Sequence, residues 1–394
     1  MARRTLRGAA AVAGVGETPY YKWGRSPDPE FVLAVKAILA ACADAGIDPR
    51  DVDGFASYSG DRNDATRLAA ALGIRELRYA NMVWGGGGAG GAAAVANGAA
   101  AIATGMANRV VVFRALAQGQ FGRFGSGAGS PIAAGPGAFS APYGLLSAAQ
   151  SFAMRTQRLV HERGVSLDTQ RAVAMASYHH AQNNPRAVMH GRPLRSEDYD
   201  NSRWIVEPYR LFDCCQENDG AAAIILVPGE EAGDFPHPPA YLLGAAQGTG
   251  WREGAGVHNS PDYASAGFRS VAPRLYEMAG LGPSDVDCVQ SYENFTGGVV
   301  MSLIEHGHCT YEEANEFITM DNLIAPYGKL PLNTSGGNLA ECYVHGFELH
   351  LEAVRQLRGT STNPVSPCHV SMVAAGPMVA PTSDVLYGSE EALQ

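Results

Sequence analysis

One stretch of this chain occurs twice. Residues 45–59 read AGIDPRDVDGFASYS and residues 279–293 read AGLGPSDVDCVQSYE, with eight of fifteen positions identical. Each copy passes through a turn into an expected strand that ends at a tyrosine, Tyr58 or Tyr292. Such repetition indicates a duplicated α/β unit, which places the matching loops of its two halves around a shared axis, where a site can form.

The composition is that of a globular protein with a large core. The chain has 394 residues, 46% of them hydrophobic and 17% charged, so its length allows two domains or one large duplicated domain. The net charge of -10 and the lack of any run of Lys and Arg argue against a nucleic-acid partner. No stretch is apolar over the length of a membrane span, so we expect no membrane segment.

The cysteines suggest neither a disulfide framework nor a zinc site. They are odd in number and scattered, and no pair has the C-x-x-C spacing. A reducing cytoplasm fits this usage. The seven are Cys42, Cys214, Cys215, Cys288, Cys309, Cys342 and Cys368.

The first half begins with alternating strands and helices. We expect strands at 9–14, 52–58 and 110–113 and an amphipathic helix at 28–45. Between Ala89 and Gly105 nearly every residue is Ala, Gly or a small aliphatic. A helix of this composition is apolar all round and must therefore be buried.

An insertion of about residues 115–205 follows. Residues 117–144 are rich in Gly, Ala, Ser and Pro without periodicity, which indicates a long loop or lid, and helical patterns resume at 145–163 and 167–183. Asn218-Asp219-Gly220 predicts a tight turn into a buried strand that ends at Val227.

The polar, proline-bearing connection at 228–239 separates an expected first half, 1–230, from a second half, 231–394. There we expect a strand near Tyr241, a helix at 271–279 and a strand at 286–292.

The second half has its own entry to a buried helix, within residues 330–359. Aligning Gly346 with Gly91 places Tyr343 opposite Gly88. We expect Tyr343 and Gly88 each to lie at the N-terminus of a central helix, where free N–H groups and the helix dipole favour negative charge.

Taken in order, these segments resemble a known family. GVGETPYY, VDGFASYSGD, the Gly/Ala helix, NDGAAAIILV, SYENF and NTSGGNLAECYVHG are similar to the thiolase superfamily, in its sterol-carrier-protein-x or lipid-transfer-protein branch. The resemblance runs nearly end to end. It implies an α/β architecture with a duplicated, five-layer αβαβα fold, action on acyl-CoA thioesters, and a dimer.

The chain departs from a thiolase at the catalytic positions. The nucleophilic cysteine of thiolases falls on Gly88, the catalytic histidine of their Gly-His-Pro motif on Tyr343, and the catalytic Asn or His on Tyr292. Residues 372–377, where the second cysteine belongs, contain none. Without a thiolate no acyl-enzyme can form by the usual two-cysteine route.

Two phenols remain, and they fit retro-aldol cleavage of a β-hydroxyacyl-CoA. The double tyrosine replacement is similar to the steroid side-chain aldolases of this branch. The resemblance implies a carbon–carbon lyase that releases propionyl-CoA from a 17-hydroxy steroid CoA thioester during cholesterol side-chain degradation and leaves a 17-ketone. We assign Tyr292 as the base on the hydroxyl and Tyr343 as the acid at the enolate.

Other polar residues are weaker candidates. His345 either orients the thioester or a phenol, or makes a structural hydrogen bond, and Asn294 and Asn333 either donate to a carbonyl or cap turns. Glu293 and Glu341 are expected to tie loops together.

No bound cofactor or metal is expected. The Gly-rich run at 85–91 lacks the acidic residue of a dinucleotide site. The family resemblance implies that the CoA thioester enters as substrate. His306, His308 and Cys309 lack a fourth metal ligand, and Cys214-Cys215 is interpreted as packing.

Two other functions remain open. One is a non-catalytic, thiolase-like subunit that binds an acyl-CoA or sterol as a scaffold. The other is an acyltransferase that uses the displaced Cys342. By resemblance we also expect a homodimer that pairs with a separate OB-fold, zinc-ribbon subunit in a heterotetramer.

Overall fold

A computed structural model describes residues 5–84, 87–121, 135–253, 260 and 262–394. Within these ranges, ten strands form one mixed sheet in the order β10-β11-β12-β9-β1-β8-β5-β3-β4, with β2 paired to β8, and β6 and β7 form a separate two-stranded sheet. The strands before residue 230 are β1 (Ala10–Glu17), β2 (Tyr21–Lys22), β3 (Gly54–Tyr58), β4 (Tyr79–Val83), β5 (Val110–Ala117), the small ribbon β6 (Trp204–Val206) and β7 (Tyr209–Arg210), and β8 (Asn218–Pro228). Those after it are β9 (Ala240–Gly248), β10 (Cys288–Ser291), β11 (Val370–Ala375) and β12 (Thr382–Gly388).

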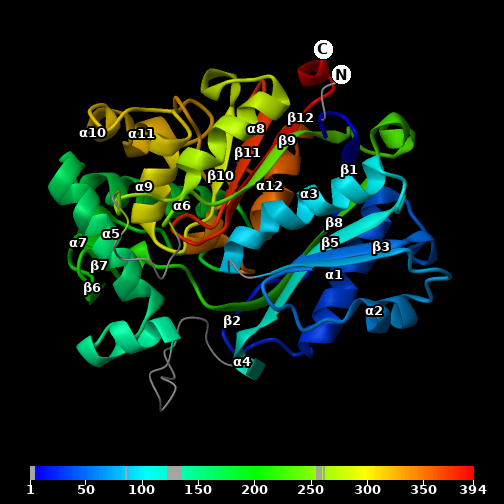
Figure 1. The fold of residues 1–394 in the computed structure, drawn as a ribbon, viewed down its shortest axis with the longest axis horizontal. Helices are drawn as coiled ribbons and strands as arrows, with labels where there is room; N and C mark the ends of the chain where they lie inside the picture. Colours follow the sequence, from blue (N-terminus) through cyan, green and yellow to red (C-terminus); the bar gives the residue numbers. More distant parts are fainter. Residues whose placement is uncertain (1–4, 85–86, 122–134, 254–259, 261) are drawn as a thin grey trace.

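The helices pack in layers on these strands (Figure 1). The helices of the first half are α1 (Glu30–Ala45), α2 (Ala65–Leu72), α3 (Gly90–Ala103), α4 (Gln118–Phe121), α5 (Ala148–Arg163), α6 (Asp168–Asn183) and α7 (Ser196–Asp200). Those of the second half are α8 (Ala272–Ala279), α9 (Thr296–Glu305), α10 (Ala314–Phe317), α11 (Met320–Leu323) and α12 (Glu348–Leu357).

Helices α3 and α12 form the central layer, because each contacts strands from both halves of the chain. On the outer faces, α1 covers β1, β5 and β8, and α8 covers β9 and β12. The two groups of strands meet where Ala11 and Val12 of β1 pair with Tyr241 and Ala240 of β9. Helix, strand, helix, strand and helix layers therefore follow one another, which confirms the duplicated five-layer fold.

The two copies of the repeated sequence fold alike. In the first, α1 ends before Gly46 at φ +66°, and a 3-10 turn leads into β3. In the second, α8 ends before Gly280 at φ +69°, and a 3-10 turn leads into β10. A positive φ favours glycine, so both helices end at a glycine in the left-handed conformation. The shared helix–turn–strand prediction is confirmed.

The small residues of α3 allow close packing on both sides. A Cβ added at Gly98 would lie 2.9 Å from the side chain of Leu226, and one added at Gly90 would lie 2.5 Å from Tyr58. Most of the helix is buried, as its composition predicts.

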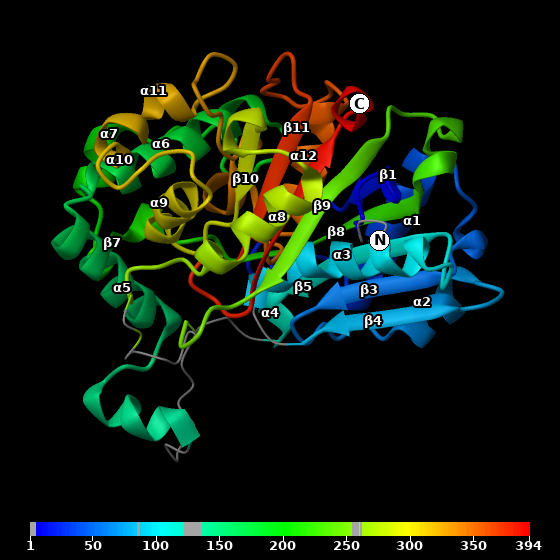
Figure 2. The ribbon, with the colours of Figure 1, turned by 45° about the horizontal axis from the view of Figure 1, so that its top comes forward.

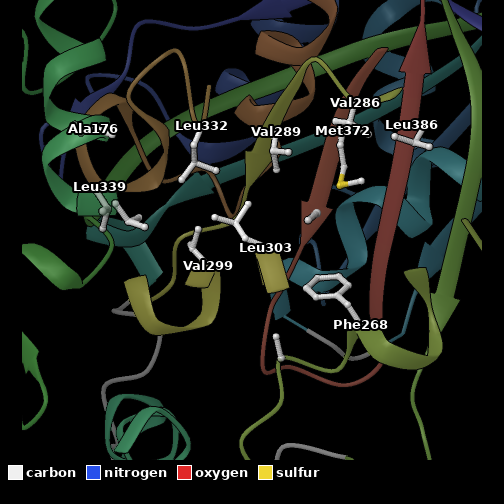
Figure 3. Packing of buried hydrophobic residues seen from close by; sticks show 14 of the residues in the cluster. Ala176, Phe268, Val286, Val289, Val299, Leu303, Leu332, Leu339, Met372 and Leu386 are labelled. Carbon is white, nitrogen blue, oxygen red and sulfur yellow. The ribbon is translucent and has the colours of Figure 1, made fainter. Parts of the chain in front are cut away.

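The core of the second half packs α9 against β10 and β11 (Figure 3). Val289 and Met372 are direct partners in the parallel pair of β10 and β11. Val299 and Leu303 of α9 belong to the same cluster, and all four side chains are fully buried or nearly so. This core fixes the end of β10, where Tyr292 follows.

Two local predictions from the sequence need correction. Asn218, Asp219 and Gly220 form no turn but begin β8, because β2 and β5 pair with them. The second central helix, α12, begins at Glu348, so Tyr343 lies in the loop before it rather than at its first turn.

The predicted helices at 145–163 and 167–183 are present as α5 and α6. Short helical turns at Gly135–Phe139 and Ala141–Tyr143 occupy part of the expected loop and project from the body in Figure 2. The rest of that prediction, 122–134, lies outside the described residues. Among the helices of the described ranges, none combines the length and apolarity that crossing a bilayer requires.

Candidate active site

A cavity of about 470 Å³ lies where the end of β10, the turn before α3 and the loop before α12 meet. Aromatic side chains from α5 and from the segment after β10 supply part of its apolar wall. Its lining includes Gly87, Gly88, Gln118, Ala148, Phe152, Ile205, Cys214, Cys215, Glu217, Tyr292, Asn294, Phe295, Tyr343 and His345. The five residues that the sequence nominates for the site, Tyr292, Tyr343, His345, Asn294 and Gly88, are therefore all at this cavity.

Tyr292 is held between two glycines. Its backbone N–H, one residue beyond β10, donates to the Ala374 carbonyl at 2.9 Å. A Cβ added at Gly88 would lie 2.4 to 2.8 Å from the Tyr292 ring and hydroxyl, and one added at Gly346 would lie 2.3 Å from the ring. A cysteine at position 88 is therefore incompatible with this placement of the Tyr292 ring.

Tyr343 also lines this cavity and comes from the loop before α12. Its backbone N–H donates to Asn218 Oδ1 at 2.7 Å, which explains why a polar residue begins the buried strand β8. The two phenolic oxygens, Tyr292 Oη and Tyr343 Oη, lie 2.8 Å apart. The structure thus joins two residues that the sequence places in separate motifs.

Burial raises the pKa of both phenols, which are already protonated near neutral pH. Loss of solvent raises the pKa of Tyr292 well above its ordinary value, and the nearby Tyr343 adds to this. Burial also raises the pKa of Tyr343, while its hydrogen bond with Tyr292 acts in the opposite direction. Either hydroxyl can donate in this contact, and when Tyr292 donates, the Tyr343 proton is free to point elsewhere.

His345 closes one side of the pair. Its ring centroid lies 5.8 Å from that of Tyr343 and 6.5 Å from that of Tyr292. Burial first, and the charge of Arg114 second, lower the pKa of His345 well below its ordinary value. The imidazole is therefore neutral, with one ring nitrogen that donates and one that accepts.

Tyr58, Arg114 and Asp61 form a support that the sequence reasoning missed. The Tyr58 hydroxyl donates to the His345 carbonyl at 2.9 Å, and the two rings stack at 5.7 Å. The buried Arg114 donates to the Tyr58 carbonyl and pairs with Asp61 at 3.0 Å. Tyr58 matches Tyr292 in the repeat, and that correspondence was the signal that could have found it.

The remaining polar candidates mostly hold the backbone. Asn294 donates to the Pro377 carbonyl at 3.3 Å and accepts from the Phe295 N–H. Asn333 brackets Ser291 by accepting from its N–H and donating to its carbonyl.

The two glutamates that the sequence reasoning assigned to tying loops do so. Glu293 accepts from Ser177 and from the Leu339 N–H, and Glu341 accepts from Asn184.

The displaced cysteine Cys342 does not offer a nucleophile. Cys342 is fully buried, and burial followed by the charges of Glu348 and Glu341 raises the pKa of its thiol well above the ordinary value. Such a thiol is inert, which argues against an acyltransferase built on Cys342. Cys214 and Cys215 form no disulfide. Both line the cavity, so they are not only packing residues, as the sequence had suggested.

The described part of the chain contains no group of three or more side chains able to hold a metal ion. His306 bonds the Ser302 carbonyl at 2.8 Å and lies 3.3 Å from Asp384. His306 therefore links the end of α9 to β12, the strand that contains Asp384.

Comparison with known proteins gives consistent matches. Residues 252–386 match the thiolase C-terminal domain-like family. A steroid side-chain-cleaving aldolase of Thermomonospora curvata is 42% identical, with 98% of this chain and 99% of that protein aligned. A 17-hydroxy-3-oxo-4-pregnene-20-carboxyl-CoA lyase of Mycobacterium tuberculosis is 40% identical, with 97% of this chain and 100% of that protein aligned.

Solved structures agree with the fold. An Ltp2-ChsH2(DUF35) aldolase superposes with a TM-score of 0.91 at 40% identity, covering 99% of this chain and 100% of that one. Human mitochondrial 3-ketoacyl-CoA thiolase superposes with a TM-score of 0.68 at 17% identity, covering 98% of this chain and 100% of that one. The second likeness concerns the fold alone.

Proposed function

Because this chain belongs to the thiolase superfamily, in its branch of steroid side-chain-cleaving aldolases, we propose that it cleaves a carbon–carbon bond in a β-hydroxyacyl-CoA. The substrate class is a 17-hydroxy steroid whose side chain ends in a CoA thioester, and the products are a 17-ketosteroid and propionyl-CoA. The observation that carries this proposal is the direct contact of Tyr292 and Tyr343 in the cavity.

The two phenols act as one proton relay. The substrate hydroxyl gives its proton to Tyr292, Tyr292 passes its own proton to Tyr343, and Tyr343 gives its proton to the carbon that becomes the α-carbon of propionyl-CoA. The bond between that carbon and C17 breaks, and its electrons form the thioester enolate. One proton leaves oxygen and one arrives at carbon, so the balance closes.

This relay suits phenols with raised pKa values. A free phenolate is costly in a buried site, but a concerted transfer through touching hydroxyls avoids one. The neutral His345 beside the pair can donate a hydrogen bond to the thioester oxygen as the enolate develops. The proton transfer and the stabilisation of the enolate therefore both use side chains of this chain.

The test is to incubate the purified protein, with and without a partner subunit, with a 17-hydroxy steroid CoA thioester. We expect equal amounts of 17-ketosteroid and propionyl-CoA. If both preparations bind the thioester but form neither product, the chain is a scaffold and the proposed activity is wrong.

A second copy of the chain is the proposed partner of β4, the terminal strand of the described sheet. Its residues 80–82 are exposed, and exposed apolar side chains occur at Met82 (46%) and just beyond the strand at Trp84 (92%). An exposed apolar edge of this kind invites pairing with another strand. A Met82→Lys change should convert the dimer into a monomer, which light scattering measures. A Met82→Lys protein that remains a dimer would show that β4 is not the dimer interface.

A second kind of subunit is proposed from the relative whose solved structure is an aldolase with ChsH2(DUF35). An OB-fold, zinc-ribbon protein of that kind would complete a heterotetramer of two copies each. Co-expression followed by mass measurement of the purified assembly tests this composition.

A further inference from the structure

Two buried side chains, Asn338 and Glu348, connect the backbone beside one phenol to the backbone beside the other. The N–H of Glu293, the residue after Tyr292, donates to Asn338 Oδ1 at 2.8 Å. The N–H of Val344, the residue after Tyr343, donates to Glu348 Oε2 at 3.2 Å.

Between these ends the Asn338 amide donates to Glu348 Oε1, so the chain of hydrogen bonds is continuous. Both side chains are fully buried or nearly so.

We propose that Asn338 and Glu348 form a positioning bridge that holds Tyr292 and Tyr343 at contact distance. This inference rests on the proposed function, for which it supplies the device that sets the geometry of the relay. The other anchors of the two tyrosines lie apart, since Tyr292 N–H bonds to β11 and Tyr343 N–H to β8. The bridge instead links the two tyrosine segments to each other.

The donors and acceptors of the bridge match along its whole length. Asn338 offers one acceptor to the Glu293 N–H and one donor to the carboxyl group of Glu348, and the two oxygens of Glu348 then each receive one N–H. An amide paired with a carboxyl group matches these donors and acceptors. Burial raises the pKa of Glu348 well above its ordinary value, and the hydrogen bonds from the Val344 N–H and from Asn338 act in the opposite direction. A glutamine at 348 would turn an N–H group toward a donor, and an aspartate at 338 would face a second carboxylate.

Exchanging the amide and the acid between positions 338 and 348 tests whether this match of donors and acceptors holds the bridge. In the double variant N338D/E348Q, the new carboxylate at position 338 accepts from the Glu293 N–H and from the new amide at position 348. The oxygen of that amide accepts from the Val344 N–H. The central hydrogen bond reverses its direction while both backbone contacts and the net charge are kept. The single variants Asn338→Asp and Glu348→Gln each leave two donors or two acceptors facing each other in the bridge.

We expect each single variant to lower kcat by about 10- to 100-fold with KM changed by less than about threefold, because misplacement of about 1 Å has effects of this size. The double variant should recover kcat to within about threefold of wild type. Crystal structures should show the Tyr292–Tyr343 oxygen distance lengthened in the single variants and restored in the double.

Glu352→Gln is the matched control. Glu352 is buried one turn further along α12 and accepts from the Thr334 and Ser361 hydroxyls rather than from the backbone N–H beside either tyrosine. This variant should lose stability without losing kcat. A fall in kcat equal to that of Glu348→Gln would mean that any buried defect in α12 has the same effect, and would overturn the bridge.

The outcomes separate the bridge from the reaction. Single variants with wild-type kcat and an unchanged oxygen distance overturn the bridge even if the wild-type enzyme cleaves its substrate. A distance that lengthens and recovers as expected supports the bridge even if no cleavage is found. Where a single variant fails to fold, the double variant must still fold with the distance restored, and its failure also overturns the proposal.

Discussion

Tyr292 and Tyr343 lie 51 positions apart in the chain, yet their phenolic oxygens are 2.8 Å from each other. Tyr292 follows a strand of the sheet and Tyr343 precedes a central helix, so the fold and not the local sequence creates the pair. Direct contact between two hydroxyls allows a proton to pass from one to the other. The proposed chemistry depends on this contact.

Gly88 should be indispensable because the Tyr292 ring occupies the space of its missing side chain. In Gly88→Ala the new Cβ would lie 2.4 to 2.8 Å from ring and hydroxyl atoms of Tyr292. We expect a loss of about 1–3 kcal/mol in the free energy of unfolding, as in overpacked cores, and at least a roughly 10-fold fall in kcat from displacement of the ring. Urea unfolding and steady-state kinetics measure both.

Gly233→Ala is the control for this change, since a Cβ added at Gly233 meets nothing within 4 Å and its φ is not positive. Full activity in Gly88→Ala would show that the ring has room to move and would contradict the packing argument.

The source of the new carbon–hydrogen bond gives a second prediction. If the relay delivers the proton, cleavage in D₂O should place one deuterium on the α-carbon of each propionyl-CoA. Because more than one proton moves in the same step, the rate should fall along a curve as the deuterium fraction of the solvent rises. Mass spectrometry and initial rates measure these quantities, and a strictly linear fall would mean that a single proton moves.

Cys342 should be dispensable for cleavage. Its thiol is buried and its pKa is raised, so it has no part in the relay. Cys342→Ala should cost about 1 kcal/mol or more of stability through the cavity it leaves and should keep kcat within about threefold, an effect of less than about 1 kcal/mol on the barrier. Loss of all turnover in a folded Cys342→Ala protein would instead revive the acyltransferase.

Much of the fold could be predicted from the sequence because its signals are local. The repeated segment keeps a glycine after each helix, and in both copies that glycine takes a positive φ. The Ala/Gly composition of α3 similarly dictates burial. Asn218 misled because an Asn-Asp-Gly triplet is an ordinary turn signal, whereas here Asn218 starts a strand and accepts the Tyr343 N–H.

The site could be predicted only in part. Tyr292 and Tyr343 emerged from their positions in family motifs, but their supports did not. Glu348 is unremarkable in sequence as an acidic residue at a helix start, and its role depends on Asn338, ten positions away on another element. Contacts of this kind are set by tertiary packing and leave no periodic signal.

The buried Glu293 gives a prediction about pH. Burial raises the pKa of this carboxyl to about 7 in the folded state, above its value of about 4.3 in an unfolded chain. The folded state therefore holds the proton more tightly, so the stabilising contribution of protonated Glu293 is full below about pH 4.3 and is lost as pH rises through about 7.

Relative to wild type, Glu293→Gln should therefore gain up to about 3 kcal/mol in the free energy of unfolding between about pH 5 and 8. Urea unfolding over this range measures the difference. The exposed Glu277→Gln is the control and should follow wild type. Parallel curves for Glu293→Gln and wild type would mean that this carboxyl is ionised in the folded protein.

The central claim is that the two phenols carry the bond cleavage together. Its most direct test is the kcat of Tyr292→Phe, Tyr343→Phe and the double variant on a 17-hydroxy steroid CoA thioester, with the exposed Tyr327→Phe as control. Each single change should lower kcat by about 10²- to 10⁴-fold, and the double should be little worse than either, because the residues act as a unit. Near-wild-type turnover in both folded single variants would contradict the account.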